Sequence, residues 1–132
     1  MRILVQKFGG TSVASRETRE QANEHIMEAR KRGYAVVVVV SAMGRKGDPY
    51  ATDSLLSLIG EQDRTNRRER DLLMSCGEMV SAVIFAAQLR AQGVESCVLT
   101  GGQAGIITNE DFSRAQIVTV NPTRILQELE QD

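Results

Sequence analysis

The chain has 132 residues, of which 42% are hydrophobic and 25% are charged, and its formal net charge is −1 at pH 7. This size and composition are typical of one soluble globular domain with one hydrophobic core. The net charge gives no electrostatic case for nucleic acid or a membrane as a partner of the whole chain. The longest apolar run, residues 35–40, is too short to span a bilayer, and the start of the chain does not resemble a signal peptide.

The two cysteines, Cys76 and Cys97, lie far apart in the chain and outside any CxxC pattern. Both have apolar neighbours, so we expect buried, reduced thiols of the kind found in a cytoplasmic protein. The single histidine, His25, lies among charged residues, and we expect it at the surface.

The first 60 residues alternate between strand and helix patterns. Residues 2–8 predict a strand, and residues 16–32 predict a helix that Ser15 caps at its N-terminus. The valine run at 35–40 does not alternate with polar residues, which is typical of a parallel strand buried on both faces. A loop at 41–52 and a short helix at 53–60 follow, the latter capped by Thr52 and Asp53.

The longest predicted helix covers residues 67–91, after a polar loop at 62–66. Its apolar side chains form a wide stripe, and we expect its second half to be buried. The stripe comprises Leu72, Cys76, Met79, Val80, Val83, Ile84 and Ala87.

The last third of the chain predicts shorter elements. Residues 96–100 predict a third strand, which a glycine-rich loop at 101–105 follows. Strand-like pieces at 106–108 and 116–120 precede a helix at 122–131, which Pro122 opens. Strands that alternate with helices indicate an α/β fold with three αβα layers around a mostly parallel sheet.

A strand-to-helix turn at residues 7–12 (KFGGTS) is the most informative motif. Backbone N–H groups at such a turn can bind phosphate, and a lysine adds positive charge. The motif matches neither the Walker A pattern nor GxGxxG, because its lysine precedes its glycines. A glycine turn without a ligand is the alternative, although an unpaired Lys7 at the end of a buried strand favours anion binding.

Ligands of parallel sheets bind at the carboxyl ends of the strands. Loops 9–14, 41–52 and 101–105 leave those ends, and all three contain glycine and hydroxyl residues. We therefore expect the three loops to converge on a site. Ser41, directly after the buried strand, either caps that strand or directs its hydroxyl at a phosphate or carboxylate.

Glu78 lies in the middle of the most apolar helix. It shares one helix face with Asp71, Ser75 and Ser81, so this polar stripe is either exposed or lines a cleft. The preceding Gly77 costs about 1 kcal/mol relative to alanine in a helix, which suggests a packing or ligand reason for it. A carboxylate in a cleft would suit an ammonium ligand.

These motifs together resemble aspartate kinase of the amino acid kinase superfamily. The resemblance rests on VQKFGGTSV at 5–13, VVVSAMG at 38–44, SCGE at 75–78 and TGGQAG at 100–105. It covers residues 1 to about 122 and implies the N-terminal half of an amino-acid-kinase fold.

The resemblance implies phosphoryl transfer from ATP, held with Mg²⁺, to the side-chain carboxylate of L-aspartate. The product is 4-phospho-L-aspartate, in the first step towards lysine, threonine and methionine. By the resemblance, Lys7 contacts the transferring phosphate and is the catalytic residue. The resemblance places the nucleotide against Lys7, Phe8, Gly9, Gly10 and Ser41. It places aspartate against Ser41, Thr52 and Glu78.

The family's kinase domain is longer than this chain, so we expect residues 1–132 to form a partial domain. The segment with the nucleotide half and the regulatory ACT domains does not appear in it, and we expect the isolated chain to be inactive. We also expect a homo-oligomer, because half of a sheet would expose a strand edge and apolar faces.

Two alternatives remain open at the level of sequence. One is another amino acid kinase, acting on glutamate, acetylglutamate or UMP. The other is a non-catalytic interaction domain that kept the half-fold for assembly.

Overall fold

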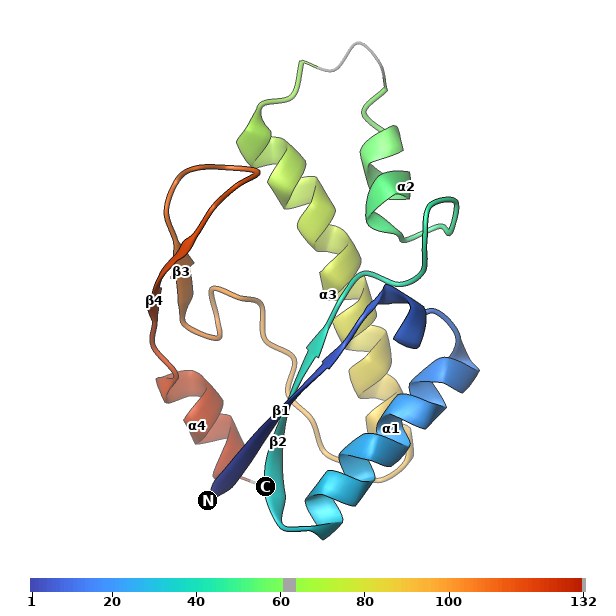
Figure 1. Ribbon diagram of the computed structural model, residues 1–132, viewed down its shortest axis with the longest axis vertical. Helices are drawn as coiled ribbons and strands as arrows, with labels where there is room; N and C mark the ends of the chain where they lie inside the picture. Colours follow the sequence, from blue (N-terminus) through green and yellow to red (C-terminus); the bar gives the residue numbers. More distant parts are fainter. Residues whose placement is uncertain (61–63, 132) are drawn as a thin grey trace.

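The computed structural model describes residues 1–60 and 64–131 (Figure 1). In chain order the elements are β1 (Arg2–Phe8), the 3₁₀ turn η1 (Gly10–Ser12), α1 (Arg16–Lys31), β2 (Tyr34–Val40), α2 (Thr52–Ser57), α3 (Arg67–Ala91), β3 (Ile106–Thr108), β4 (Ile117–Val120) and α4 (Thr123–Leu129).

Strands β1 and β2 pair in parallel, in a register that runs from Arg2 opposite Tyr34 to Phe8 opposite Val40. Helix α1 connects them, which confirms the predicted strand–helix–strand unit and the α/β class. Because the two strands end level with each other, the turn after Phe8 and the loop after Val40 leave the same edge of the sheet. The shared edge is what allows a site to form there.

The hydrophobic core lies between one face of this sheet and helices α1 and α3. Its buried side chains are Val13, Ala22, Ile26, Met43, Phe85, Leu89 and Val94. The ring of Phe8 stacks on Phe85 with centroids 5.9 Å apart, which joins β1 to α3. On the opposite face, Val5 is 62% and Val39 is 46% exposed, so the expected burial of both faces is wrong at Val39.

Helix α3 has the predicted bounds but presents a different face to the core. Its buried residues are Gly77, Ser81, Phe85, Ala86 and Leu89. In the predicted apolar stripe, Leu72 is 60% and Val83 is 53% exposed. The small residues allow close packing, since a Cβ on Gly77 would lie 2.8 Å from Ala42 Cβ and 3.0 Å from the Tyr50 carbonyl oxygen.

Within the described residues, α3 is also the one helix long and apolar enough to cross a membrane by length and composition. A core helix of a globular domain passes the same test. Phe85 and Leu89 of α3 are buried in the domain core, whereas Val83 in the same half is 53% exposed, so core packing accounts for the apolar residues on one side of the helix.

Residues 96–100 do not form the predicted strand. A strand needs a backbone ladder, and the Ser96 carbonyl instead accepts a hydrogen bond from Arg90 Nη1 at 2.9 Å, while Ser96 Oγ donates to the Ala86 carbonyl. These bonds hold the segment to the end of α3. The predicted strands at 106–108 and 116–120 are present as the antiparallel pair β3–β4.

Smaller expectations have mixed outcomes. Helix α2 begins at Thr52, and its N-cap is Ala51 without a side-chain cap, so the predicted Thr52–Asp53 cap is wrong. Both cysteines are free, but neither is buried as expected, since Cys76 is half-buried and Cys97 is exposed. Desolvation and the neighbouring Glu128 raise the pKa of the Cys97 thiol. His25 is exposed as predicted. The predicted loop at 62–66 lies partly outside the described residues.

Ser15 begins α1 as predicted, in a reciprocal capping box with Thr18. A hydrogen bond from the backbone and a second from the Ser15 hydroxyl lower the pKa of Glu17 in the first helical turn. A lowered carboxyl pKa stabilises the fold above the ordinary pKa of glutamate, and this contribution is lost as the pH falls through the lowered value.

We expect Ser15→Ala to lower the free energy of unfolding by about 1 kcal/mol, because an N-cap side chain is lost. The pKa of Glu17, measured by NMR titration, should rise towards its ordinary value. Ser75→Ala, at an exposed position inside α3, is the control and should leave both quantities unchanged. An unchanged Glu17 pKa in Ser15→Ala would contradict the capping interaction.

Candidate functional site

The glycine turn, residues 9–12, begins where β1 ends. Gly9 is extended, with φ −75° and ψ 171°, and the Ser12 N–H donates to the Gly9 carbonyl at 2.9 Å. Gly9 has open space where a side chain would be, since a Cβ there meets nothing within 4 Å. A ligand could therefore approach the backbone closely at this point.

Loop 41–44 is bound to the glycine turn through the backbone. The Ser41 N–H donates to the Phe8 carbonyl at 3.2 Å, and the Gly44 N–H donates to the Gly10 carbonyl at 3.0 Å. A Cβ on Gly10 would lie 2.8 Å from the carbonyl oxygens of both Ala42 and Gly44. Only glycine fits at position 10 without moving the loop, so the sequence requires Gly10 for this contact.

Glu78 reaches the same loop from α3. Its Oε1 accepts a hydrogen bond from the Ala42 N–H at 3.4 Å, and the carboxylate is half-buried. The neighbouring Gly77 lies against Ala42 and Tyr50, which brings the start of α2 and its first residue, Thr52, to the same part of α3. The polar stripe of α3 thus faces inward at Glu78 and at Ser81, which is fully buried.

The structure brings most of the predicted site residues together. Gly9, Gly10 and Ser41 are joined at the edge of the sheet, with Glu78 bonded to the same loop. Lys7 is exposed and makes no hydrogen bond or ion pair within the described residues. The ring of Phe8 packs in the core, so any contact of Phe8 with a nucleotide would involve its backbone.

The third predicted loop, at 101–105, lies apart from the glycine turn, as Figure 1 shows. It is closed by the Ala104 N–H, which donates to the Thr100 carbonyl, and by the Asn121 N–H, which donates to the Gly105 carbonyl. The expectation that three loops converge is therefore met by the loops after β1 and β2 and not by this one. It follows a segment that forms no strand, so no sheet edge directs it to the site.

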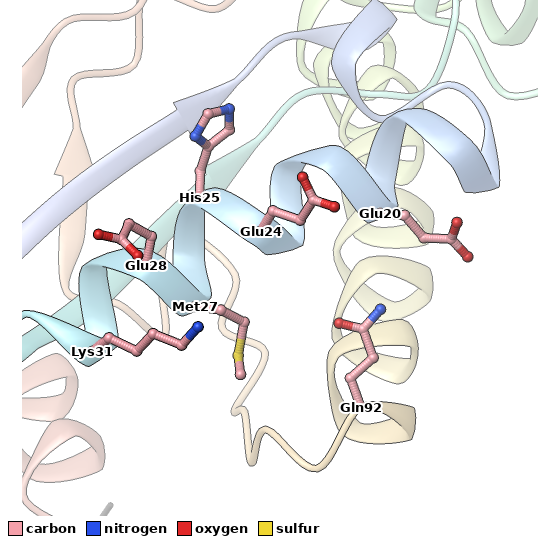
Figure 2. A pocket seen from close by; sticks show the side chains of 7 residues that line it. All are labelled: Glu20, Glu24, His25, Met27, Glu28, Lys31 and Gln92. Carbon is pink, nitrogen blue, oxygen red and sulfur yellow. The ribbon is translucent and has the colours of Figure 1, made fainter.

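A hollow beside α1 is a different surface from this site (Figure 2). It is lined by Glu20, Glu24, His25, Met27, Glu28, Lys31 and Gln92. Three carboxylates against one lysine would repel a phosphate. Two of them also pair along the helix, Glu20 with Arg16 and Glu28 with Arg32, so this hollow is a solvated helix face.

Arg19 lies next to the glycine turn and loop 41–44, and the sequence analysis missed it. Its guanidinium donates to the Val13 carbonyl, to Met43 and to Gln88 of α3. An arginine in a charged helix gives no local signal for such contacts, because Met43 and Gln88 lie 24 and 69 positions away in the chain.

The comparisons with known proteins agree with this geometry. The sequence matches the model of the Amino acid kinase family over residues 2–132. The chain belongs to the amino acid kinase family. Among curated members, Aspartokinase 1 of Bacillus subtilis (strain 168) is 55% identical over 130 residues, which cover 98% of this chain and 32% of that protein. Aspartokinase of Geobacillus stearothermophilus is 43% identical over 95% of this chain and 30% of its own length.

Solved structures of the family show the same fold. The crystal structure of aspartate kinase from Synechocystis matches 81% of this chain and 18% of its own, with a TM-score of 0.70 and 39% identity. E. coli aspartokinase III, in complex with aspartate and ADP, matches 99% of this chain and 39% of its own, with a TM-score of 0.74 and 19% identity. This family member spans about a third of the length of the curated relatives it matches.

The two adjacent glycines of the turn should respond differently to the same substitution. Gly10→Ala should lower the free energy of unfolding by about 1–3 kcal/mol, because its Cβ would overlap two backbone carbonyls. Gly9→Ala is the matched control and should leave stability within about 0.5 kcal/mol, since its Cβ enters open space. Urea unfolding measures both. Equal effects would contradict the close contact between the turn and loop 41–44.

Proposed function

We propose that this chain forms the phosphate- and aspartate-binding part of an aspartate kinase, which transfers the γ-phosphoryl group of ATP to the side-chain carboxylate of L-aspartate. The names of its relatives support this, since proteins 55% and 43% identical to nearly the whole chain are aspartokinases. A further member with the same fold is described in complex with aspartate and ADP.

The observation that carries the proposal is the backbone contact between the glycine turn and loop 41–44. It joins the glycine turn, whose residues Gly9 and Gly10 carry backbone N–H groups, to the loop that begins with Ser41 at the end of a parallel sheet, where α/β proteins bind ligands. In our proposal these groups bind phosphate oxygens of ATP. Lys7, exposed and without a partner among the described residues, contacts the phosphoryl group in transfer.

The substrate side of the proposed site lies towards α3. Glu78 is half-buried next to loop 41–44, and as a carboxylate it can bind the α-ammonium group of aspartate. Thr52, at the first turn of α2, and Ser41 supply hydroxyl groups for the carboxylates of aspartate. Ser41 is thereby shared between nucleotide and substrate.

The chemistry requires little from the protein except alignment and charge. An anionic carboxylate attacks an anionic phosphate, so catalysis depends on holding the two in line and on stabilising the charge of the transition state. The ammonium of Lys7 and the N–H groups of the turn provide positive charge and hydrogen-bond donors. Mg²⁺ would enter with the nucleotide, where it binds the phosphate oxygens.

We also propose a cytoplasmic location. Two free thiols, Cys76 and Cys97, are typical of a reducing compartment, and ATP is available there. This location is part of the proposal and rests on the same family relationship.

The proposal is tested by Lys7→Ala in a protein that joins this chain to the remainder of Bacillus subtilis Aspartokinase 1, whose matching segment it replaces. The fusion should form 4-phospho-L-aspartate from ATP and aspartate, which hydroxylamine trapping measures. Lys7→Ala should lower kcat by about 10²–10³-fold, because one preorganised transition-state contact is lost.

The matched control in the fusion is Lys31→Ala, an exposed lysine at the end of α1, which should retain the activity of the parent. If the fusion folds but phosphorylates glutamate or UMP rather than aspartate, the proposed substrate is wrong. A fusion without any kinase activity, although well folded, would favour an interaction domain instead. An unchanged kcat in Lys7→Ala would show that Lys7 takes no part in the reaction.

We propose that the chain forms a homo-oligomer. Its surface carries large exposed apolar side chains on the outer face of α3 and on the open face of the sheet, among them Leu72, Val83 and Val5. Light scattering of the purified chain should give a mass at least twice that of the 14.5 kDa monomer. Leu72→Lys together with Val83→Lys should shift the mass towards the monomer, whereas a monomeric parent chain would overturn this proposal.

A further inference from the structure

Arg19 is half-buried under the proposed site and bonds to three separate parts of the chain. Its Nη1 donates to the Val13 carbonyl at 2.8 Å and contacts Met43 Sδ at 3.6 Å. Its Nε donates to Gln88 Oε1 at 2.9 Å. The side-chain amide of Gln88 in turn donates to the Arg16 carbonyl at 3.2 Å, which fixes its orientation.

These three partners belong to the three elements that form the site. Val13 ends η1, Met43 lies between Ser41 and Gly44, and Gln88 is on the helix that carries Glu78. Val13 is fully buried and Met43 nearly so. Water therefore cannot readily take the place of the Arg19 guanidinium at either residue. Arg16 and Arg32 differ from Arg19 in this respect. Both are exposed, and each pairs with a glutamate four positions away along α1.

We propose that Arg19 is a positioning residue for the reaction, which holds the glycine turn in register with loop 41–44 and with α3. The inference rests on the proposed function. Arg19 acts through the backbone of the turn: with its Val13 end held, the N–H groups of Gly9 and Gly10 keep the direction that phosphate binding requires. Preorganised donors of this kind determine the rate of charge-stabilised reactions.

The arrangement requires arginine rather than another cation. A planar guanidinium presents donors in several fixed directions at once, so one side chain can bond to a carbonyl, a thioether and an amide oxygen. A lysine ammonium could reach the Val13 carbonyl but would not hold all three elements in one geometry. Arg19→Lys therefore keeps the positive charge and removes the planar set of donors.

The test is hydrogen exchange of the 132-residue chain, read at the amides of Ser12 and Gly44, which bond across the turn and across the loop. We expect about tenfold faster exchange at both amides in Arg19→Ala, since a hydrogen bond of the turn loses its support. The amides of the β1–β2 ladder should be unchanged. Arg19→Lys should give intermediate exchange at Ser12.

Two further variants keep the test decisive. Arg32→Ala removes an exposed arginine at the C-cap of the same helix and should leave both amides at parent rates. If Arg19→Ala does not fold, Gln88→Ala, which removes the α3 bonds to Arg19 and to the Arg16 carbonyl and keeps the Val13 and Met43 contacts, should speed exchange at both amides by less than tenfold. Equal exchange in the Arg19 variants and Arg32→Ala, or a uniform increase over the whole chain, would overturn the proposal.

A binding measurement connects the geometry to the ligand. In calorimetry with MgADP, Arg19→Ala in the fusion with the remainder of Bacillus subtilis Aspartokinase 1 should bind about tenfold more weakly than the unsubstituted fusion, and Arg19→Lys should recover part of this loss. Unchanged MgADP affinity in the Arg19→Ala fusion would overturn the positioning role. An unsubstituted fusion that binds neither MgADP nor L-aspartate would count against the proposed function, and the exchange rates of the 132-residue chain would still decide whether Arg19 holds the turn.

Discussion

The contact between two backbone segments at Gly10 is the constraint on which the site depends. The Gly44 N–H reaches the Gly10 carbonyl, and two loop carbonyls occupy the space that a side chain at position 10 would need. Parallel pairing of β1 with β2 in level register makes this approach possible, because both chain segments leave the sheet at one edge. Lys7 and Gly9 precede this contact directly in the chain, and Ser41 begins the loop that makes it.

Helix α3 adapts to the same constraint with small residues. Gly77 lets Ala42 and the start of α2 approach the helix, and the buried Ser81 continues that face. The buried face of the helix carries these small residues next to the loop and Phe85 and Leu89 further along, while Leu72 and Val83 lie outside it.

The sequence predicted the bounds of the long elements and the centre of the site, because their signals are local. Ser15 and the glycines beyond α1 and α3 mark helix ends, and the glycine turn follows directly from β1. It failed where structure depends on a distant partner. Apolar periodicity does not tell which face of α3 packs, residues 96–100 lack a ladder partner, and Arg19 has no local signature.

The long-range contacts of the site have a consequence for folding order. Glu78 bonds to a residue 36 positions away and Arg19 to one 69 positions away, so both bonds must wait for α3. Closing such long loops is slow, and the contacts that require it form late. During synthesis the sheet and α1 can associate first, and the glycine turn gains its final shape only when about the first ninety residues have left the ribosome.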